Sequence, residues 1–195
     1  FDIILPVGIS FYTFQALSYT MDVYRGEVEA ERNLFKYALF VSFFPQLVAG
    51  PIERSKNLLH QVNERHYFEP DRVRDGLLLM LWGMAEKIVI ADRVSYLVTY
   101  VYDNYAALPG AATVLATVLF AVQIYCDFSG YSDIAIGAAQ VMGFSLMENF
   151  RRPYLATSVQ DFWRRWHVSL STWFRDYVYI PLGGNRKGIV RKYFN

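Results

Sequence analysis

Two long stretches of the chain contain no charged residue, and they constrain the fold more than any other feature of the sequence. They are Ile3–Tyr19 and Ala106–Cys126. A helix that crosses the hydrocarbon core of a bilayer needs about 20 mostly apolar residues, with about 17 as the lower limit. Both stretches meet this limit, so the sequence predicts two membrane-crossing helices.

Two further apolar stretches are weaker candidates for membrane spans. Tyr37–Ile52 is slightly short, but Lys36 beside it can extend its charged end to the lipid headgroups. Leu77–Ala91 is interrupted by Glu86 and Lys87. The interior of a helix bundle or a membrane interface can accommodate such charges.

The composition agrees with a membrane protein and argues against other classes. Apolar residues make up 54% of the 195 residues and charged residues 19%, against about 45–50% and about 25% in soluble domains. A formal net charge of +1 argues against a nucleic-acid partner, because such proteins carry a basic surplus. The single cysteine, Cys126, excludes an intrachain disulfide and a metal site built from several cysteines. We therefore expect no bound metal.

The distribution of basic residues suggests a topology. Cytoplasmic loops of membrane proteins carry an excess of lysine and arginine. By this rule three polar stretches face the cytoplasm: Glu53–Asp75, Asn149–Asp176 and Arg186–Lys192. Asp22–Lys36 and Asp92–Tyr105 then face outward. Ile134–Met147 is expected to be re-entrant or interfacial, because an extra crossing would break this scheme and so short an apolar segment rarely spans.

A polar run, Gln123–Gly137, follows the second uncharged stretch directly. If the helix continues through it, polar side chains at i, i+4, i+7 and i+8 share one face: Tyr125, Ser129, Ser132 and Asp133. Carboxylates near hydrocarbon are costly and usually face a cavity or a partner. The alternative is an interfacial turn in which Asp127 and Ser129 cap a new helix. The sequence leaves both possibilities open.

A second informative run, Phe162–Asp176, is rich in tryptophan and arginine. Ser158 followed by Asp161 fits a helix-start capping signature, and no Gly or Pro interrupts the run, so one amphipathic helix is expected. An interfacial helix accounts for the tryptophans and arginines but leaves His167 unexplained. That histidine is either an ordinary hydrogen-bonding residue or a general base acting on a hydroxyl, since imidazole titrates near neutrality.

Six sequence words occur in order over essentially the whole chain and resemble those of the membrane-bound O-acyltransferases. The similarity is to the bacterial branch that acetylates alginate and related exopolysaccharides. The words are Pro6–Gln15 with Asp22–Arg25, Phe43–Ile52 with Arg54, Asp127–Asp133, Asn149–Phe150 with Pro153–Tyr154, Phe162–Ser171, and Arg175–Gly184.

The resemblance implies an all-α, multi-pass bundle of tilted helices around a tunnel through the bacterial inner membrane. Residues 1–195 would be an internal part of a single such domain. It implies O-acyl transfer, with acetyl expected, to hydroxyls of a cell-surface polysaccharide such as alginate, or to a periplasmic or extracellular relay acetyltransferase. The donor would be a thioester of coenzyme A or of an acyl carrier protein from the cytoplasm. No bound cofactor is expected, and membrane lipids surround the bundle.

The resemblance also implies two active-site positions. The first corresponds to His167, and the second is a histidine in a Trp-His-Gly word that would lie beyond Asn195. This part of the protein alone is therefore expected to be inactive. The second histidine would take the proton of the acceptor hydroxyl, while His167 orients that hydroxyl or stabilises charge on the acyl oxygen.

Further site residues follow from the same resemblance. The tunnel is expected to be lined by Tyr125, Asp127, Ser129, Tyr131, Ser132 and Asp133. The site is expected to be supported by Asn149, Trp166, Ser171, Arg175 and Asp176.

Two other functions stay open. One is D-alanyl transfer to teichoic acids, which keeps the fold and changes the cargo. The other is a non-catalytic conduit for acyl groups or lipid, because carboxylates such as Asp127 and Asp133 at membrane depth also mark transport pathways. The hydropathy-related halves that transporters often display are not visible in this sequence.

Overall fold

The computed structural model describes residues 8–47, 50–186 and 188. Within these ranges the chain folds into helices joined by turns and loops, with no strand. The all-α prediction is therefore confirmed for the described residues. The chain divides into two compact units, one from Phe1–Tyr67 with Phe144–Asn195 and the other from Phe68–Gly143. Each unit is described by itself.

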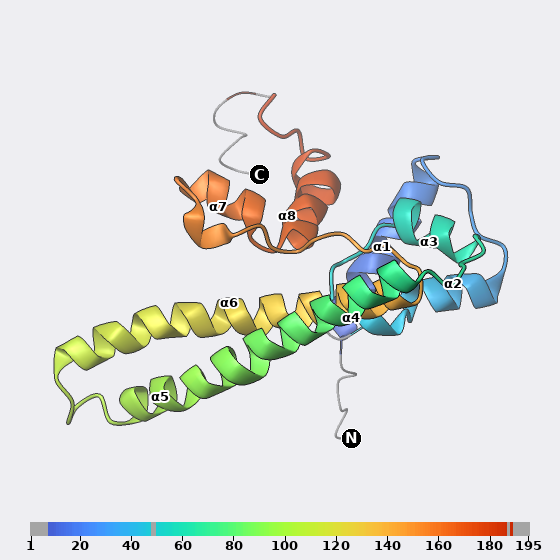
Figure 1. Ribbon diagram of the computed structural model, residues 1–195. Helices are drawn as coiled ribbons and strands as arrows, with labels where there is room; N and C mark the ends of the chain where they lie inside the picture. The colour runs from blue at the N-terminus through green and yellow to red at the C-terminus, as the bar shows by residue number, and fades with distance from the viewer. Residues whose placement is uncertain (1–7, 48–49, 187, 189–195) are drawn as a thin grey trace, which may run out of the picture. The chain divides into compact units, whose positions relative to one another are not determined.

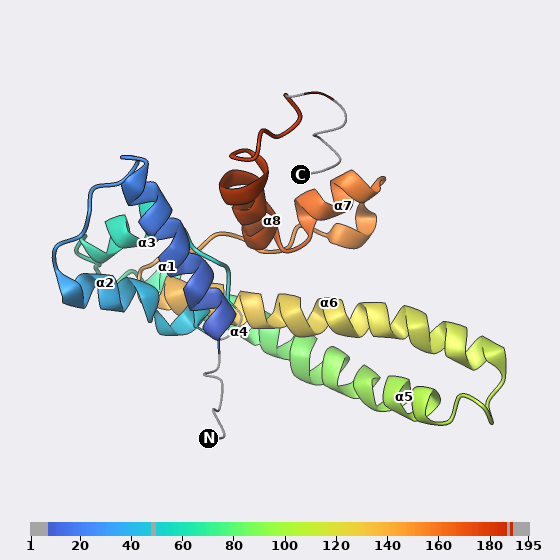
Figure 2. The same cartoon turned by 180° about the vertical axis from the view of Figure 1, so that it is seen from behind.

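The second unit is a helical hairpin (Figures 1 and 2). Its first arm runs without interruption through α4 (Pro70–Met84), a π-helical segment (Ala85–Ala91) and α5 (Asp92–Asp103). Its second arm is α6 (Gly110–Val141), a helix of 32 residues. At 1.5 Å per residue α6 is about 48 Å long, against about 30 Å for the hydrocarbon core of a bilayer. Among the described residues, α6 is the one helix long and apolar enough to cross a membrane.

Glycines let the two arms of the hairpin approach to backbone contact. A Cβ added at Gly83 would lie 2.4 Å from the carbonyl oxygen of Gly130, and one at Gly137 would lie 2.5 Å from that of Gly76. The two glycines on each arm are seven residues apart, so the pairs lie on one face of each helix. Close approach of this kind is how small residues hold helices together where lipid gives no hydrophobic drive.

The polar run after Cys126 is part of α6, so the alternative of an interfacial turn with a new helix is wrong. The prediction of a separate re-entrant or interfacial segment over Ile134–Met147 is also wrong, because its first part belongs to α6. Packing of the α6 glycines against α4 stabilises a helix that continues past the apolar stretch. The helix ends at Val141. Gly143, two residues further on, has a φ of 95° and donates its N–H to the carbonyl of Gln140 at 3.0 Å, as expected of a glycine beyond a helix end.

The first unit consists of shorter helices. They are α1 (Ile9–Tyr24), α2 (Leu34–Val41), a 3-10 turn (Phe44–Gln46), α3 (Ser55–Val62), a second 3-10 turn (Pro153–Leu155), α7 (Val159–Arg165), α8 (Val168–Phe174) and a π-helical turn (Arg175–Tyr179). The buried centre of this unit is made by Ile52, Trp173 and Tyr177. The Trp173 ring meets Phe14 of α1 with 4.6 Å between ring centroids, and its Nε1–H donates to the Phe14 carbonyl at 3.1 Å. This contact ties α8 to α1.

Two sequence predictions in the first unit change in the structure. Tyr37–Ile52 is not one helix: α2 ends at Val41, and Pro45 lies in the 3-10 turn that follows. The helix predicted over Ile3–Tyr19 begins at Ile9, after Gly8 in a left-handed conformation, and runs on to Tyr24. Residues 3–7 of that prediction lie outside the described residues.

Candidate functional site

The Phe162–Asp176 run is two helices rather than one, and the break falls at His167. Helix α7 ends at Arg165, and α8 starts at Val168. His167 has a left-handed backbone with φ 45°, which is uncommon for a residue other than glycine and costs about 1–3 kcal/mol. The predicted single helix is therefore wrong. Its predicted start is confirmed, because the Ser158 hydroxyl accepts from the Asp161 N–H at 3.1 Å.

Backbone hydrogen bonds on both sides of His167 hold this strained conformation. The N–H of Arg151 donates to the carbonyl of Arg165 at 2.8 Å, and the N–H of Val168 donates to the carbonyl of Asn149 at 2.9 Å. The segment that begins at Asn149 therefore forms a short ladder with the break between α7 and α8. Strain at a single residue persists when the surrounding structure fixes it in this way.

The ring of His167 is held by the side chain of Asn149. His167 Nδ1 lies 3.1 Å from Asn149 Oδ1. The same oxygen accepts from the Ser169 hydroxyl at 2.8 Å and from the Ser169 N–H at 3.4 Å. Asn149 is 1% exposed and Ser169 is fully buried. The predicted supporting residue Asn149 thus contacts the predicted active-site histidine, and Ser169 is a contact that the sequence analysis missed.

Burial sets the charge state of His167. It lowers the pKa of the imidazole from 6.5 to about 4, because the imidazolium form loses hydration when it leaves water. At neutral pH the ring is therefore uncharged and one of its nitrogens keeps a lone pair. A neutral imidazole can accept a proton or a hydrogen bond from a hydroxyl.

Two more predicted supporting residues lie beside His167. The Ser171 hydroxyl donates to the Trp166 carbonyl at 3.3 Å, and the Ser171 N–H donates to the His167 carbonyl at 3.0 Å. The Trp166 ring stacks on Phe162 at 5.5 Å and meets Phe150 edge-on at 5.0 Å. Ser171 and Trp166 therefore fix the backbone around the histidine.

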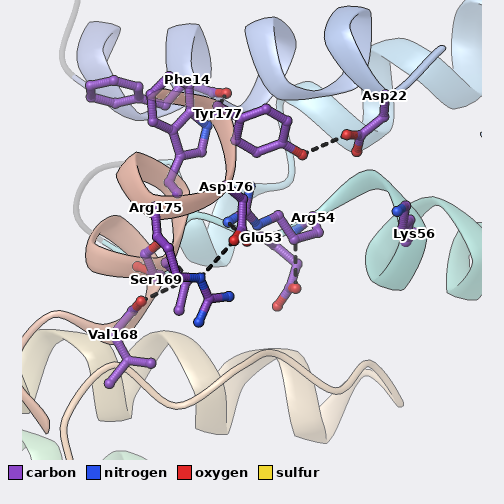
Figure 3. A network of polar contacts seen from close by, with 12 residues as sticks. Phe14, Asp22, Glu53, Arg54, Lys56, Val168, Ser169, Arg175, Asp176 and Tyr177 are labelled. Atoms are coloured by element: carbon purple, nitrogen blue, oxygen red, sulfur yellow. Dashed lines mark hydrogen bonds and ion pairs between the residues drawn. The ribbon is translucent and has the colours of Figure 1, made fainter. Parts of the chain in front are cut away.

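The remaining two supporting residues belong to a second cluster in the same unit. Asp176 accepts from Arg175 Nε at 2.7 Å and from Arg54 Nη2 at 3.1 Å. Figure 3 shows this carboxylate facing Arg54, with the Tyr177 hydroxyl pointing to Asp22. Residues of this cluster line a cavity of about 350 Å³.

Buried acids stabilise this second cluster. Asp22, which is 2% exposed, accepts from the Tyr177 hydroxyl at 2.7 Å and from the Ser55 hydroxyl at 3.0 Å. Burial and the hydrogen bond to Asp22 raise the pKa of Tyr177. Glu53, 1% exposed, accepts from the N–H of Met147 at 2.8 Å. Asp22 and Arg54 occur in the sequence words that carry the family resemblance, but nothing in the sequence shows that they meet.

The predicted tunnel residues all lie on α6 in the second unit. Ser129 and Ser132 are buried, while Tyr125, Tyr131 and Asp133 are partly buried. Asp127 is exposed and forms an ion pair with Lys87 of the other arm.

A buried acid near these residues was not singled out from the sequence. Glu86, 8% exposed, accepts from Trp82 Nε1 at 3.0 Å. It lies in the π-helical segment and packs against α6, since a Cβ at Gly130 would lie 3.2 Å from the Glu86 Cβ. The sequence feature that could have identified Glu86 is its charge within the otherwise apolar stretch Leu77–Ala91. Across the described ranges, no three His, Cys, Asp or Glu side chains gather closely enough to hold a metal ion.

Comparison with known proteins places the chain in a family. The family model of the membrane-bound O-acyltransferases, MBOAT, matches residues 29–195. The chain belongs to this family. The resemblance found in the six sequence words is therefore confirmed, and the MBOAT assignment agrees with the long apolar helix α6.

Curated relatives of this MBOAT chain include transferases of three kinds. The probable alginate O-acetylase of Pseudomonas putida is 47% identical over 99% of the chain and 39% of its own length. The peptidoglycan O-acetyltransferase of Helicobacter pylori is 36% identical over 94% of the chain and 40% of its length. The teichoic acid D-alanyltransferase of Bacillus subtilis is 29% identical over 92% of the chain and 46% of its length. The chain thus spans less than half the length of these relatives.

Proposed function

We propose that the full-length protein to which this chain belongs transfers acetyl groups to hydroxyls of a cell-surface polysaccharide. The observation that carries the proposal is a neutral histidine, His167, held by a buried amide at the position that the family words mark. The 47% identity to an alginate O-acetylase and the 36% identity to a peptidoglycan O-acetyltransferase support acetyl as the cargo and a polysaccharide as the acceptor. Alginate or a related exopolysaccharide is the proposed polymer.

The hydrogen bonds at His167 favour one of its two expected roles. Asn149 Oδ1 is an acceptor, so a neutral imidazole that faces it carries its proton on Nδ1. Nε2 then has the lone pair and accepts a hydrogen bond from the acceptor hydroxyl. In this tautomer Nε2 has no proton to donate to an acyl oxygen. We therefore assign His167 to orienting the hydroxyl, with the second family histidine, beyond Asn195, taking its proton.

The rest of the proposal concerns the membrane. The full-length protein is proposed to be a multi-pass protein of the bacterial inner membrane, with its helices around a tunnel lined by polar residues of α6. The donor would be a cytoplasmic thioester, and its acetyl group would pass to the polymer or to an extracytoplasmic relay acetyltransferase. A thioester needs no metal or bound cofactor to transfer its acyl group to a hydroxyl when general-base and oxyanion help are present.

The test is a pair of substitutions at His167 in the full-length protein. His167→Ala removes the imidazole, and His167→Asn removes it while supplying a residue that tolerates a left-handed backbone. Both are expected to lower polymer acetylation about 100-fold, the loss that misplacement of a reacting group by about 1 Å can cause. The measurement is incorporation of labelled acetate as ester on the polysaccharide, at equal protein levels. Acetylation within twofold of wild type in His167→Asn would remove His167 from the reaction.

D-alanyl transfer remains the second candidate, because the Bacillus subtilis relative covers 92% of the chain. Cells fed labelled acetate or labelled D-alanine distinguish the two cargoes directly. Acetate label as an alkali-labile ester on the polymer supports acetyl transfer. D-alanine label in that position would replace acetyl with D-alanyl in the proposal, and neither label would favour the conduit.

A further inference from the structure

We propose that Asn149 is the positioning residue that fixes the tautomer of His167, and that Ser169 in turn fixes the amide of Asn149. The inference rests on the proposed function, because it gives the histidine of that site its working form. It concerns residues that are 18 positions apart in the chain and that meet through the ladder between the Asn149 segment and the break at His167.

The orientation of the Asn149 amide is decided by a backbone group. The N–H of Ser169 can only donate, and it points at Asn149 Oδ1 at 3.4 Å. The Ser169 hydroxyl donates to the same oxygen at 2.8 Å. An amide flipped by 180° would set its NH₂ against the Ser169 N–H, so the oxygen is the atom that faces this side.

The orientation of the amide then decides the tautomer of the ring. Asn149 Oδ1 carries no proton, so His167 Nδ1 at 3.1 Å must carry one to make a hydrogen bond. In the other neutral tautomer the lone pair of Nδ1 would face the lone pairs of Asn149 Oδ1. The Ser169 hydroxyl also lies 3.4 Å from Nδ1, but it donates its one proton to Asn149 Oδ1 at 2.8 Å. Lone pairs without a donor are unfavourable where water cannot replace the partner. His167 is thereby held with Nε2 as its acceptor atom.

The side chain of Asn149 can be changed without removing its backbone role. One hydrogen bond that holds the left-handed turn runs from the Val168 N–H to the backbone carbonyl of Asn149. A substitution of the Asn149 side chain leaves this carbonyl in place. A variant without the amide therefore tests the effect on the tautomer of His167 while the backbone of the turn is kept.

Two of the arginines on the neighbouring elements form ion pairs with carboxylates. In the Asn149 segment, Arg151 Nε lies 3.1 Å from Glu148. On α7, Arg165 Nε lies 3.0 Å from Asp161. Arg152 and Arg164 are exposed to solvent, and burial is the cause of the lowered pKa of His167. A carboxylate at position 149 would thus be a new charge placed directly against the imidazole.

The experiment uses the full-length protein in detergent with histidine labelled by ¹³C at Cε1 and ¹⁵N in the ring. The His167 signal is the one that His167→Gln removes. In wild type the ring is expected to show a protonated Nδ1 at neutral pH. Asn149→Asp is expected to raise the titration midpoint of His167 by about one to three pH units, the usual effect of an adjacent opposite charge. Asn185→Asp, at an exposed turn, is the control that adds the same charge elsewhere and leaves the midpoint unchanged.

Kinetics supply the second readout. Asn149→Leu, which keeps the branching at Cγ and has no amide, is expected to lower kcat for acetyl transfer about tenfold or more, as misplacement of a catalytic group does. KM is expected to change little. Asn149→Asp is expected to have a higher kcat than Asn149→Leu. Its acid limb in the pH profile is expected to shift to higher pH together with the His167 midpoint.

The outcomes separate this inference from the proposed function. An unchanged His167 midpoint in Asn149→Asp, or an Nδ1 without a proton in wild type, overturns the positioning role whatever the enzyme does. The expected midpoint shift in a protein that transfers no acetyl group supports the positioning role and counts against the proposed function alone.

Discussion

The close glycine contacts between α4 and α6 make the hairpin sensitive to a single added methyl group. Gly83→Ala places a Cβ 2.4 Å from the Gly130 carbonyl oxygen and 3.0 Å from both the N and the Cγ1 of Ile134. Ordinary contacts begin near 3.4 Å, so the two helices must separate locally by about 1 Å. The atom that is struck first belongs to a backbone carbonyl, which cannot rotate away as a side chain could.

The expected energy is the difference between two opposing terms. Overpacking of a close contact costs about 1–3 kcal/mol, and a backbone clash belongs at the upper end of that range. Replacing glycine by alanine inside a helix gains about 1 kcal/mol. The net loss is therefore about 2 kcal/mol. The assay is thermal unfolding of the full-length protein, followed by the reaction of the buried Cys126 thiol of α6 with a fluorogenic maleimide.

Gly110→Ala is the matched control, because a Cβ at Gly110 meets nothing within 4 Å. It receives the same change in the same helix pair and is expected to melt at or slightly above the wild-type temperature. A Gly83→Ala protein that melts as high as Gly110→Ala would show that the helices do not pack at the distance described.

Two further predictions concern the first unit. The pKa of His167 falls from 6.5 to about 4 on folding, so the unfolded chain binds the proton first as the pH drops; the stability from this residue is complete above pH 6.5 and is lost as the pH falls toward 4. His167→Gln should flatten the dependence of the melting temperature on pH in that window, and an unchanged slope would contradict the buried imidazole. Tyr177→Phe removes the hydroxyl that donates to buried Asp22 and should cost about 1–3 kcal/mol. Tyr179→Phe, with no such bond to Asp22, is its control in thermal unfolding, and equal melting of the two variants would refute the role of this bond.

The elements that local chemistry determines were predictable from the sequence. The start of α7 follows from Ser158 and Asp161, because a capping hydroxyl acts on an amide three residues away. The helical continuation through Ser129 and Asp133 was one of two possibilities. It was decided by Gly130 and Gly137, which pack against glycines of α4 that lie 47 and 61 residues earlier in the chain. Periodicity along one helix carries no information about such a partner.

The break at His167 could not be predicted from the residues around it. No glycine or proline marks it, and histidine is not a residue that ends helices by itself. The break is imposed by the ladder to Arg151 and Asn149, a tertiary contact. The same ladder brings Asn149 to His167. The contact between these two residues and the break between α7 and α8 therefore have one cause.

The π-helical segment Ala85–Ala91 determines which residues of the first hairpin arm face α6 beyond it. Buried positions on that arm are seven residues apart before the segment, at Gly76 and Gly83, and again from the last residue of the segment, Ala91, to Val98. Across the segment the step is eight. One residue advances an α-helix by about 100°, so the wider turn absorbs a single extra residue and returns the same face to α6.

The arm therefore tolerates a change of length at one place and not at others. A related chain that is one residue shorter between Ala85 and Ala91 could keep both faces in phase with an unbroken α-helix. The same deletion within α5 would turn Val98 and everything after it away from α6. Gaps in alignments of this arm are accordingly expected to fall inside the segment.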